Sequence, residues 1–278
     1  MEAVTTAGAG SVLYLYGFVR RAADLSRVGE AGASVVVVPF GDVACAVSAV
    51  PAVEYHLPPD ASTAAQQLEW VTPLAWRHHE VLRLLQSSGA VVPLKFGTLC
   101  ADAAHVETLL QRLHDQVVAL LARFEGKDEW TLRMRADVEA VSQAVQAARA
   151  DLIALKQDAD RLPEGRAYFA RKQLQKTTAD IVAATLGDVE HRVYERLSAA
   201  SIEMAPVDPP QTPGSRDGII ANAPLLIEHG RFAELEAILG QLEREHAGIR
   251  LAFELVGPWP PYSFATSLDV NGAQECQE

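Results

Sequence analysis

The feature that most constrains the fold of this chain is the order in which two hydrophobic periods alternate along it. Residues 11–19 and 34–39 have the β-branched and aromatic content of strands, and residues 43–48 predict a third strand. The turn at 40–42 joins the last two, so we expect an antiparallel hairpin there. Beyond it, apolar side chains recur at intervals of three and four residues, as on one face of a helix: Leu68, Val71, Ala75, His78, Leu82 and Leu85.

The first half of the chain continues with a further strand and helix. Pro73 interrupts the first helical stripe, which predicts either a kink or a new helix start with Thr72 as the cap. Residues 90–96 predict a fourth strand, and a second amphipathic helix follows with Asp102 as its N-cap. We therefore expect an N-terminal domain over residues 1–124.

The second half repeats this plan with longer helices. Residues 130–137 alternate apolar and polar side chains, which predicts a half-buried strand. The apolar stripe over 138–155 predicts one helix, and after the break at 162–165 a second long helix is expected over 166–199. We expect these two helices to pair as a helical hairpin.

The last elements of the second half follow that hairpin. Strands are predicted at 202–206 and 219–227, on either side of the proline- and glycine-rich loop 207–218. A short helix over 232–242 and an alternating strand over 249–255 complete the series.

The order of elements in both halves is that of the split βαβ, or ferredoxin-like, plan, although the first half has only a weak first helix around Leu25 and Val28. The predicted fold class is α+β with two domains. The first is ferredoxin-like, and the second, over 125–264, is a ferredoxin-like α+β domain with an inserted long helical hairpin. Residues 265–278 lack apolar anchors and are expected to form a flexible tail.

The charge of the chain argues against two classes of partner. Its 278 residues carry a formal net charge of −12, which opposes binding to nucleic acid and repels an anionic lipid membrane. Cys45, Cys100 and Cys276 are far apart and form no CxxC pair, so a reducing cytoplasm fits best. The apolar runs fall short of the roughly 20 residues of a membrane-spanning helix. We expect a cytoplasmic protein that binds neither nucleic acid nor a lipid membrane.

The motifs in the chain do not predict catalysis, a cofactor or a bound metal. His78-His79-Glu80 resembles part of a zinc hydrolase motif, but that motif needs a second histidine four residues after the first, where Arg83 follows His79. His78 fits the apolar helical stripe instead. Residues 126–128 lack the glycine loop and hydroxyl residue of a phosphate-binding loop.

The basic stretch 166–176 has two interpretations. It interleaves four cations with Tyr168 and Phe169 and contains no acidic residue: Arg166, Arg171, Lys172 and Lys176. Such a stretch could bind an acidic partner, but a solvated helix face with an aromatic core edge is the favoured interpretation.

The proline-rich segment 256–264 also has two interpretations. Pro258 and Pro261 have the PxxP spacing of a polyproline ligand, but Trp259 between them is a costly aromatic residue to leave in water. We therefore expect this segment to pack on the fold as a stiff flap, with Gly257 allowing a sharp turn out of the last strand.

Six motifs in order along the chain resemble the gas vesicle protein F/L (GvpF/GvpL) family, over about residues 12–264. The motifs are Leu13-Tyr-Leu-Tyr-Gly17, Trp76-Arg-His-His-Glu-Val-Leu82, Val92-Pro-Leu-Lys-Phe-Gly-Thr98, Gly126-Lys-Asp-Glu-Trp130, Gly165-Arg-Ala-Tyr168 and Gly257-Pro-Trp-Pro-Pro-Tyr262. Family members often have Arg where Lys95 stands, and the two differ in their ability to make a bidentate contact.

This resemblance implies a minor or accessory protein of gas vesicles, which binds the small hydrophobic shell protein (GvpA-like) and other accessory proteins. It brings no catalytic residue. It implies structural or partner-binding roles for these positions: Tyr16, Gly17, Trp76, His79, Pro93, Lys95, Phe96, Gly97, Thr98, Gly126, Lys127, Glu129, Trp130, Tyr168, Gly257, Pro258, Trp259, Pro260, Pro261 and Tyr262. The alternative is a ferredoxin-like protein that senses a small molecule, since this plan often serves binding.

Overall fold

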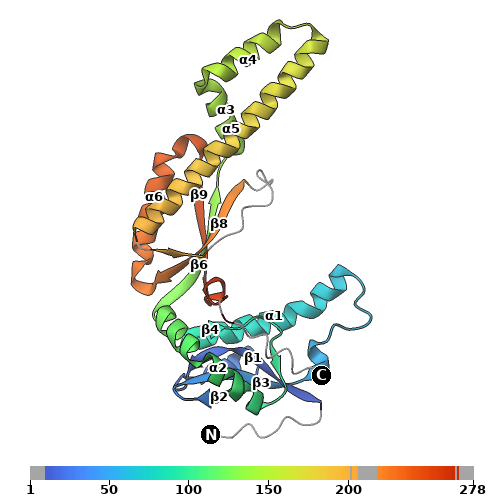
Figure 1. Ribbon diagram of the computed structural model, residues 1–278, viewed down its shortest axis with the longest axis vertical. Coiled ribbons are helices and arrows are strands. Elements are labelled where there is room, and N and C mark those ends of the chain that lie inside the picture. The colour runs from blue at the N-terminus through green and yellow to red at the C-terminus, as the bar shows by residue number, and fades with distance from the viewer. Residues whose placement is uncertain (1–9, 201, 206–217, 267, 269–278) are drawn as a thin grey trace. The chain divides into compact units, whose positions relative to one another are not determined.

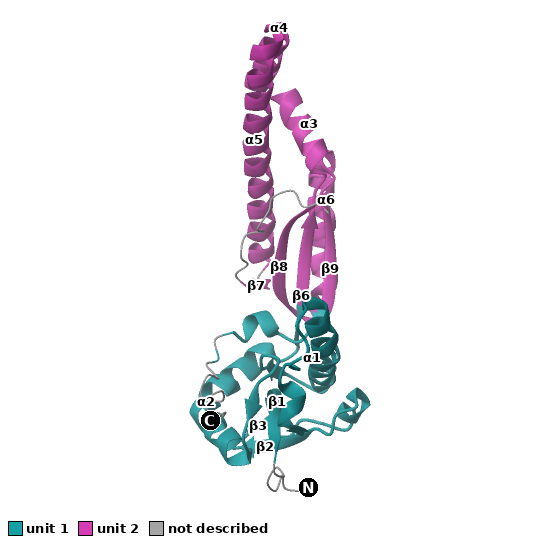
Figure 2. Cartoon of the chain, turned by 90° about the vertical axis from the view of Figure 1, so that its right-hand side faces the viewer, with its two compact units in different colours: residues 1–129, 258–278 teal, residues 130–257 magenta. Residues whose placement is uncertain are grey.

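The computed structural model describes residues 10–200, 202–205, 218–266 and 268. The chain forms two compact units, drawn in two colours in Figure 2. Unit 1 comprises Met1–Glu129 and Pro258–Glu278, and unit 2 comprises Trp130–Gly257. The segment after Gly257 is thus counted with unit 1, while the domain bounds expected from the sequence, 1–124 and 125–264, stay a prediction.

Unit 1 is built on an antiparallel sheet with the strand order β2-β3-β1-β4, and β5 pairs with β1 beside β4. The strands are β1 (Ser11–Arg20), β2 (Val36–Phe40), β3 (Val43–Pro51), β4 (Val91–Pro93) and β5 (Leu99–Cys100). The predicted hairpin is confirmed, because β2 pairs with β3 from Val36↔Val47 to Phe40↔Val43. The strand predicted at 90–96 is shorter, since a turn with Gly97 at φ 82° follows β4.

Two helices cover opposite faces of this sheet (Figure 1). They are α1 (Ala64–Gln86) and α2 (Ala103–Phe124), and short 3-10 turns lie at η1 (Val28–Ala31) and η2 (Ala52–Tyr55). Because both faces are covered, seven consecutive residues of β1 are buried. Tyr14 and Tyr16 face α1 in a core cluster with Leu82 and Leu85. Asp102 caps α2, as predicted, by accepting from the backbone N–H of His105.

Of the two alternatives predicted at Pro73, a kink or a new helix start, the new start is wrong. The helix begins after Thr63, whose side chain forms a capping box with Gln66, and it runs without a new start through Pro73. Thr72 does not cap a helix, because its hydroxyl donates to the carbonyl of Leu68 within the same helix. The first part of the predicted stripe stays in solvent, since the Leu68 side chain is 64% exposed.

Unit 2 is built on a sheet with the order β7-β8-β6-β9, so in both sheets the strands run second, third, first, fourth in chain order. The strands are β6 (Lys127–Arg135), β7 (Glu203–Met204), β8 (Ile219–Glu228) and β9 (Ala252–Trp259). Two helices cover it, α5 (Glu164–Ala199) through its C-terminal half and α6 (Phe232–Glu245). Leu132 and Met134 of β6 are fully buried in this core, which confirms the predicted alternation.

The helical insertion of unit 2 has one more break than predicted. The stripe over 138–155 is divided into α3 (Val138–Ala148) and α4 (Ala150–Arg161), because Arg149 between them is extended at φ −103° and ψ 115°. Both helices pack against α5, so the predicted helical hairpin is confirmed with a divided first arm (Figure 1).

The connecting segments contain three further short turns and two regions for which the sequence made predictions. Short 3-10 turns lie at η3 (His229–Arg231), η4 (Ala247–Ile249) and η5 (Tyr262–Phe264). Most of the predicted loop 207–218 lies outside the described residues, as does most of the tail 265–278, although Ala265 is buried.

None of the helices in the described residues combines the length and hydropathy needed to cross a lipid bilayer. The fold is α+β with two antiparallel sheets and one long helix, and its ferredoxin-like detail stays a prediction.

Candidate functional site

Side chains from motifs that are far apart in the sequence meet in unit 1, where α1 packs on the sheet. Their rings form a connected group that we call the aromatic cluster: Tyr14, Tyr16, Tyr55, Trp76, His78, His79, Phe96, Trp259 and Tyr262. Adjacent ring centroids lie between 4.6 and 6.5 Å apart. The sheet, α1, the turn after β4 and the C-terminal segment each contribute to it.

The base of the aromatic cluster is a buried hydrogen-bonded pair, Tyr14 and His78. The Tyr14 hydroxyl accepts from the backbone N–H of Gly97 at 3.2 Å and shares a second hydrogen bond with Nδ1 of His78 at 2.8 Å. Burial lowers the pKa of His78 to about 4. The nearby Leu94 carbonyl raises this pKa and offsets only part of the fall. His78 is therefore neutral at pH 7, and its buried Nε2 has no hydrogen-bond partner of good geometry among the described residues.

Tyr16 and Gly17 hold the strand against this base. The Tyr16 ring stacks on His78 at 5.9 Å, and burial raises the pKa of its hydroxyl. A bulge interrupts the pairing of β1 with β3 between Leu15 and Gly17. A Cβ at Gly17 would lie 2.7 Å from the backbone oxygen of Val92, so only glycine permits the close approach of β1 and β4.

A second histidine joins α1 to the C-terminal segment. Nδ1 of His79 lies 3.2 Å from the Tyr262 hydroxyl, and its ring meets Trp259 edge-on at 5.3 Å. Trp76, one turn earlier on α1, is 6.5 Å from the same imidazole. Burial lowers the pKa of His79, which favours its neutral form.

The proline-rich segment packs on unit 1 and is not an exposed polyproline ligand. Pro260, Pro261 and Phe264 are buried, while Trp259 is partly exposed. The amide of Gln86 at the end of α1 donates to the carbonyl of Trp259 at 3.2 Å. The predicted packing of this segment is confirmed, with Trp259 at its edge. The predicted turn at Gly257 is wrong, because β9 continues through Gly257 to Trp259.

A buried carboxylate fixes the same segment. Glu129, only 4% exposed, accepts from the backbone N–H and the hydroxyl of Ser263, each at 2.8 Å. Burial raises the pKa of Glu129, and the two bonds from Ser263 oppose that rise. Two bonds to one carboxylate therefore position the chain directly after Tyr262.

The aromatic cluster reaches the surface through two side chains. Trp76 is 64% exposed and Phe96 is 37% exposed, although both are large and apolar. Phe96 contacts the rings of Tyr14, Tyr55 and His78 beneath it. The cluster thus presents aromatic surface to solvent on a rigid, hydrogen-bonded base.

The other predicted site residues lie around the aromatic cluster or away from it. Pro93 and Lys95 border a small cavity of about 120 Å³ beside Tyr262, and Thr98 closes the turn by donating to the Lys95 carbonyl. Gly126 has φ 68° at the turn before Lys127, which opens β6. Trp130 packs on Phe232 in unit 2, and Tyr168 is 62% exposed on α5, so neither joins the cluster.

Sequence reasoning omitted four residues of this site from its candidates, namely Tyr14, Tyr55, His78 and Ser263, and it placed His78 only on the apolar stripe of its helix. Tyr14 had a usable signal, because it lies two residues before Tyr16 and so shares its face of the strand. Tyr55 and Ser263 had none, since each takes part through contacts with residues far away in the chain.

The chemistry of the site is packing and stacking. No group of three or more His, Cys, Asp or Glu side chains in the described ranges is arranged to hold a metal ion. Glu80 forms an ion pair with Arg83, and Cys45 and Cys100 are buried, with burial raising the pKa of the Cys45 thiol. Neutral imidazoles, phenols and an indole provide flat apolar surface with few charges.

Comparison with known proteins gives consistent matches. A family model described as gas vesicle synthesis protein GvpL/GvpF matches residues 12–266. Gas vesicle protein L of Streptomyces sp. (strain CB03234) is 29% identical over 244 residues, which cover 84% of this chain and 85% of that protein. Gas vesicle protein F of the same organism is 28% identical over 188 residues, which cover 67% and 75%.

Two solved structures have the same fold. The crystal structure of GvpF from Anabaena sp. PCC7120 matches with a TM-score of 0.67 at 19% identity, over 93% of this chain and 100% of that one. The crystal structure of GvpF from Microcystis aeruginosa matches with a TM-score of 0.61 at 21% identity, over 91% and 98%.

Proposed function

The chain belongs to the gas vesicle synthesis protein GvpL/GvpF family and has an accessory role in gas vesicles, and we propose that it supports vesicle assembly by binding the small hydrophobic shell protein through the aromatic cluster. Other accessory proteins of the vesicle are further partners in this proposal. The observation that carries it is the exposure of Trp76 and Phe96 on a base built by family motifs. The proposal places the protein in the cytoplasm, at the vesicle, and assigns it no catalytic residue, cofactor or metal.

The physical reason is the solubility of the shell subunit. A subunit that lines a gas space has a large apolar face before assembly, and such a face aggregates in water unless another surface covers it. Tryptophan and other aromatic residues dominate the binding energy of protein interfaces, because they bury large area with few rotatable bonds. An acidic chain with net charge −12 would also keep the complex dispersed.

The buried base supports a binding role for the exposed rings. Tyr14, His78 and Tyr262 hold the cluster by hydrogen bonds and stacking that do not involve the outer face of Trp76. Removal of the Trp76 ring therefore leaves the core of unit 1 intact. A substitution of Trp76 can therefore test binding without a large change in the stability of the chain.

The test is co-expression of the tagged chain with the gas vesicle shell protein, followed by affinity purification. Trp76→Ala and Phe96→Ala should each reduce the recovered shell protein by about tenfold or more, as for an interface hot spot. Phe169→Ala is the matched control, because Phe169 is an aromatic residue of unit 2 that is more exposed than either, at 71%. Unchanged recovery with both cluster variants would refute the assignment of this surface.

A small-molecule sensor is the alternative function. Ligand pockets usually enclose about 300 to 1,000 Å³. The cavity beside Tyr262 has only about 120 Å³, which gives this alternative less support at the cluster. A metabolite that raises the melting temperature of the purified chain in a thermal-shift screen would favour it.

A further inference from the structure

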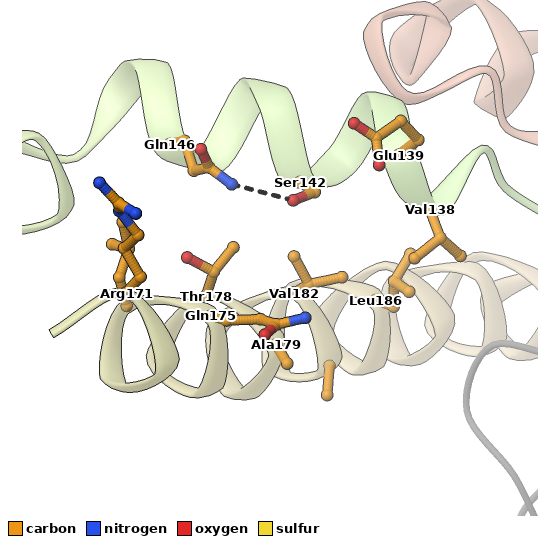
Figure 3. Close-up of a pocket in the computed structure, with 12 residues that line it drawn as sticks. Val138, Glu139, Ser142, Gln146, Arg171, Gln175, Thr178, Ala179, Val182 and Leu186 are labelled. Atoms are coloured by element: carbon orange, nitrogen blue, oxygen red, sulfur yellow. Dashed lines mark hydrogen bonds between the residues drawn. The ribbon is translucent and has the colours of Figure 1, made fainter. Parts of the chain in front are cut away.

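Unit 2 contains a groove that the proposed function does not use. It lies between α3 and α5, has a volume of about 450 Å³ and is lined by side chains of both helices (Figure 3). We call it the α3–α5 groove. All of its lining residues belong to unit 2.

The α3–α5 groove has the surface pattern that receives another helix. On α5, Leu174, Thr178, Val182 and Leu186 line it at four-residue intervals, and on α3, Val138, Ser142 and Gln146 do the same. Rows of side chains four residues apart form the ridges and grooves by which helices pack on one another. The row on α5 extends over about 18 Å, or three turns of a helix, at 1.5 Å per residue.

A buried hydroxyl lacks a partner in the middle of this groove. Thr178 is only 5% exposed, and its Oγ1 has no hydrogen-bond partner among the described residues. Three other helical threonines, Thr72, Thr108 and Thr185, each donate to the carbonyl four residues earlier. Figure 3 shows the Thr178 side chain directed from α5 toward α3. A buried polar group without a partner is costly, so an occupant that supplies one would gain affinity.

The charges around the α3–α5 groove indicate which sign of charge a bound partner should carry. Arg171 lines one end of the groove, and Glu139, which accepts from the amide of Gln143, lines the other end (Figure 3). Arg171 belongs with Arg166, Lys172 and Lys176 to a stretch of α5 whose cations form no ion pair with another described residue. Two of the three acids of α4 are already paired, Asp151 with Arg149 and Asp158 with Arg161, and Asp160 is the third. Within a chain of net charge −12, this unpaired basic stretch is complementary to an acidic partner.

We propose that the α3–α5 groove binds an acidic amphipathic helix of a partner protein. The apolar side chains of that helix, spaced by four residues, enter the groove between the two rows. A polar side chain at its centre bonds the Thr178 hydroxyl, and a carboxylate near one end meets Arg171. This site is separate from the aromatic cluster, which belongs to unit 1.

The test uses two labelled 18-residue helical peptides and the full-length chain. Both peptides have leucines at four-residue spacing and a central glutamine, and they differ only in a terminal Glu or Lys. Fluorescence anisotropy should show tighter binding of the Glu peptide. Arg171→Glu should weaken that binding by about fivefold and improve binding of the Lys peptide, the change expected for one partly exposed ion pair.

Matched variants distinguish a specific groove from general attraction. Lys172→Glu makes the same change of charge at the next residue, which does not line the groove, and should alter binding by less than about twofold. Thr178→Val keeps the branched shape without the hydroxyl and should weaken binding of the Glu peptide. Circular dichroism spectra and melting curves of each variant check that its helix content and melting temperature match those of the parent.

Three results would overturn the proposal. The first is failure of the Glu peptide to bind, and the second is an equal effect of Arg171→Glu and Lys172→Glu. The third is self-association of the chain in sedimentation experiments that Val182→Asp abolishes, which would assign the groove to a second copy. Each result leaves the test of Trp76 and Phe96 unaffected.

Discussion

The hydroxyl of Tyr14 and Nδ1 of His78 share a hydrogen bond of 2.8 Å in the core of unit 1, between β1 and α1. The two residues are 64 positions apart in the sequence. Their bond holds in place an imidazole that is 4% exposed, and it forms the base on which the exposed rings of the aromatic cluster rest.

The first prediction concerns the dependence of stability on pH. The pKa of His78 falls from 6.5 to about 4 in the folded chain, so between these values the unfolded chain binds a proton that the folded chain does not. The stability due to the neutral imidazole is complete above pH 6.5 and is lost as the pH falls toward 4. The expected loss is about 3 kcal/mol over this window.

Urea denaturation of the parent and of His78→Gln at pH 7.5, 5.5 and 4.5 checks this prediction. The variant should lose less stability than the parent as the pH falls, because it lacks the titrating imidazole. The carboxylates and the remaining histidines are common to both proteins, so their contributions cancel in the difference. If the free energies of unfolding of the two proteins fell equally with decreasing pH, the assigned protonation of His78 would be contradicted.

The second prediction concerns coupling between Tyr14 and His78. Tyr14→Phe leaves buried Nδ1 of His78 without its hydrogen-bond partner and the Gly97 N–H without its acceptor, and it should lower the free energy of unfolding by about 1–3 kcal/mol. The double variant Tyr14→Phe/His78→Leu should cost less than the sum of the two single changes, because it removes both partners.

Denaturant titrations of the four proteins at pH 7.5 measure this coupling energy. Tyr168→Phe is a suitable control, since Tyr168 is exposed on α5, and it should leave the stability unchanged. Additive single and double effects would mean that the 2.8 Å contact contributes nothing to stability.

The third prediction concerns the bulged strand β1. Gly17→Ala should destabilise unit 1 by about 2–3 kcal/mol, because the new methyl group would overlap the Val92 carbonyl and crowd Leu82. Gly29→Ala is the matched control, since a Cβ there has no heavy atom within 4 Å. A melting temperature for Gly17→Ala at or above that of Gly29→Ala would show that β4 moves away without cost.

The fourth prediction compares two aromatic residues of the C-terminal segment. Phe264 is 5% exposed, so Phe264→Ala should cost about 3–5 kcal/mol, the usual range for a buried aromatic residue. Trp259 is only partly buried and contacts His79 at 5.3 Å, so Trp259→Ala should cost less, about 2 kcal/mol. Thermal and urea unfolding measure both, and a larger cost at Trp259 would show that the segment is held mainly by its indole.

Several elements could be predicted from the sequence because the side chains within each element determine its type and where it begins. The hairpin of β2 and β3 follows from two β-branched runs around a short turn, and the start of α2 follows from the Asp102 cap. The length of α5 follows from the absence of proline between Glu164 and Ala199, and the helix tolerates Gly165 and Gly187 within it.

Other local features were predicted wrongly because two local signals competed. The capping box of Thr63 and Gln66 starts α1, so Thr72 bonds Leu68 inside the helix and does not cap a new one. The apolar stripe from Val138 to Leu155 continues in phase across Arg149, although the backbone there is extended. Periodicity reports which side chains are apolar, and it does not report whether the helix between them is continuous.

By itself, the sequence determined the α+β class, most of the elements and the residues of the family motifs. Only the tertiary structure decided that Tyr14, His78, Phe96 and Tyr262 share one cluster, with His79 and Tyr262 in contact across 183 positions. The reason is physical: a hydrophobic pattern marks the face of an element that must be buried, whereas the element that buries it is selected by the packing of the whole unit. The exposure of Trp76 and the unpartnered hydroxyl of Thr178 are properties of that packing.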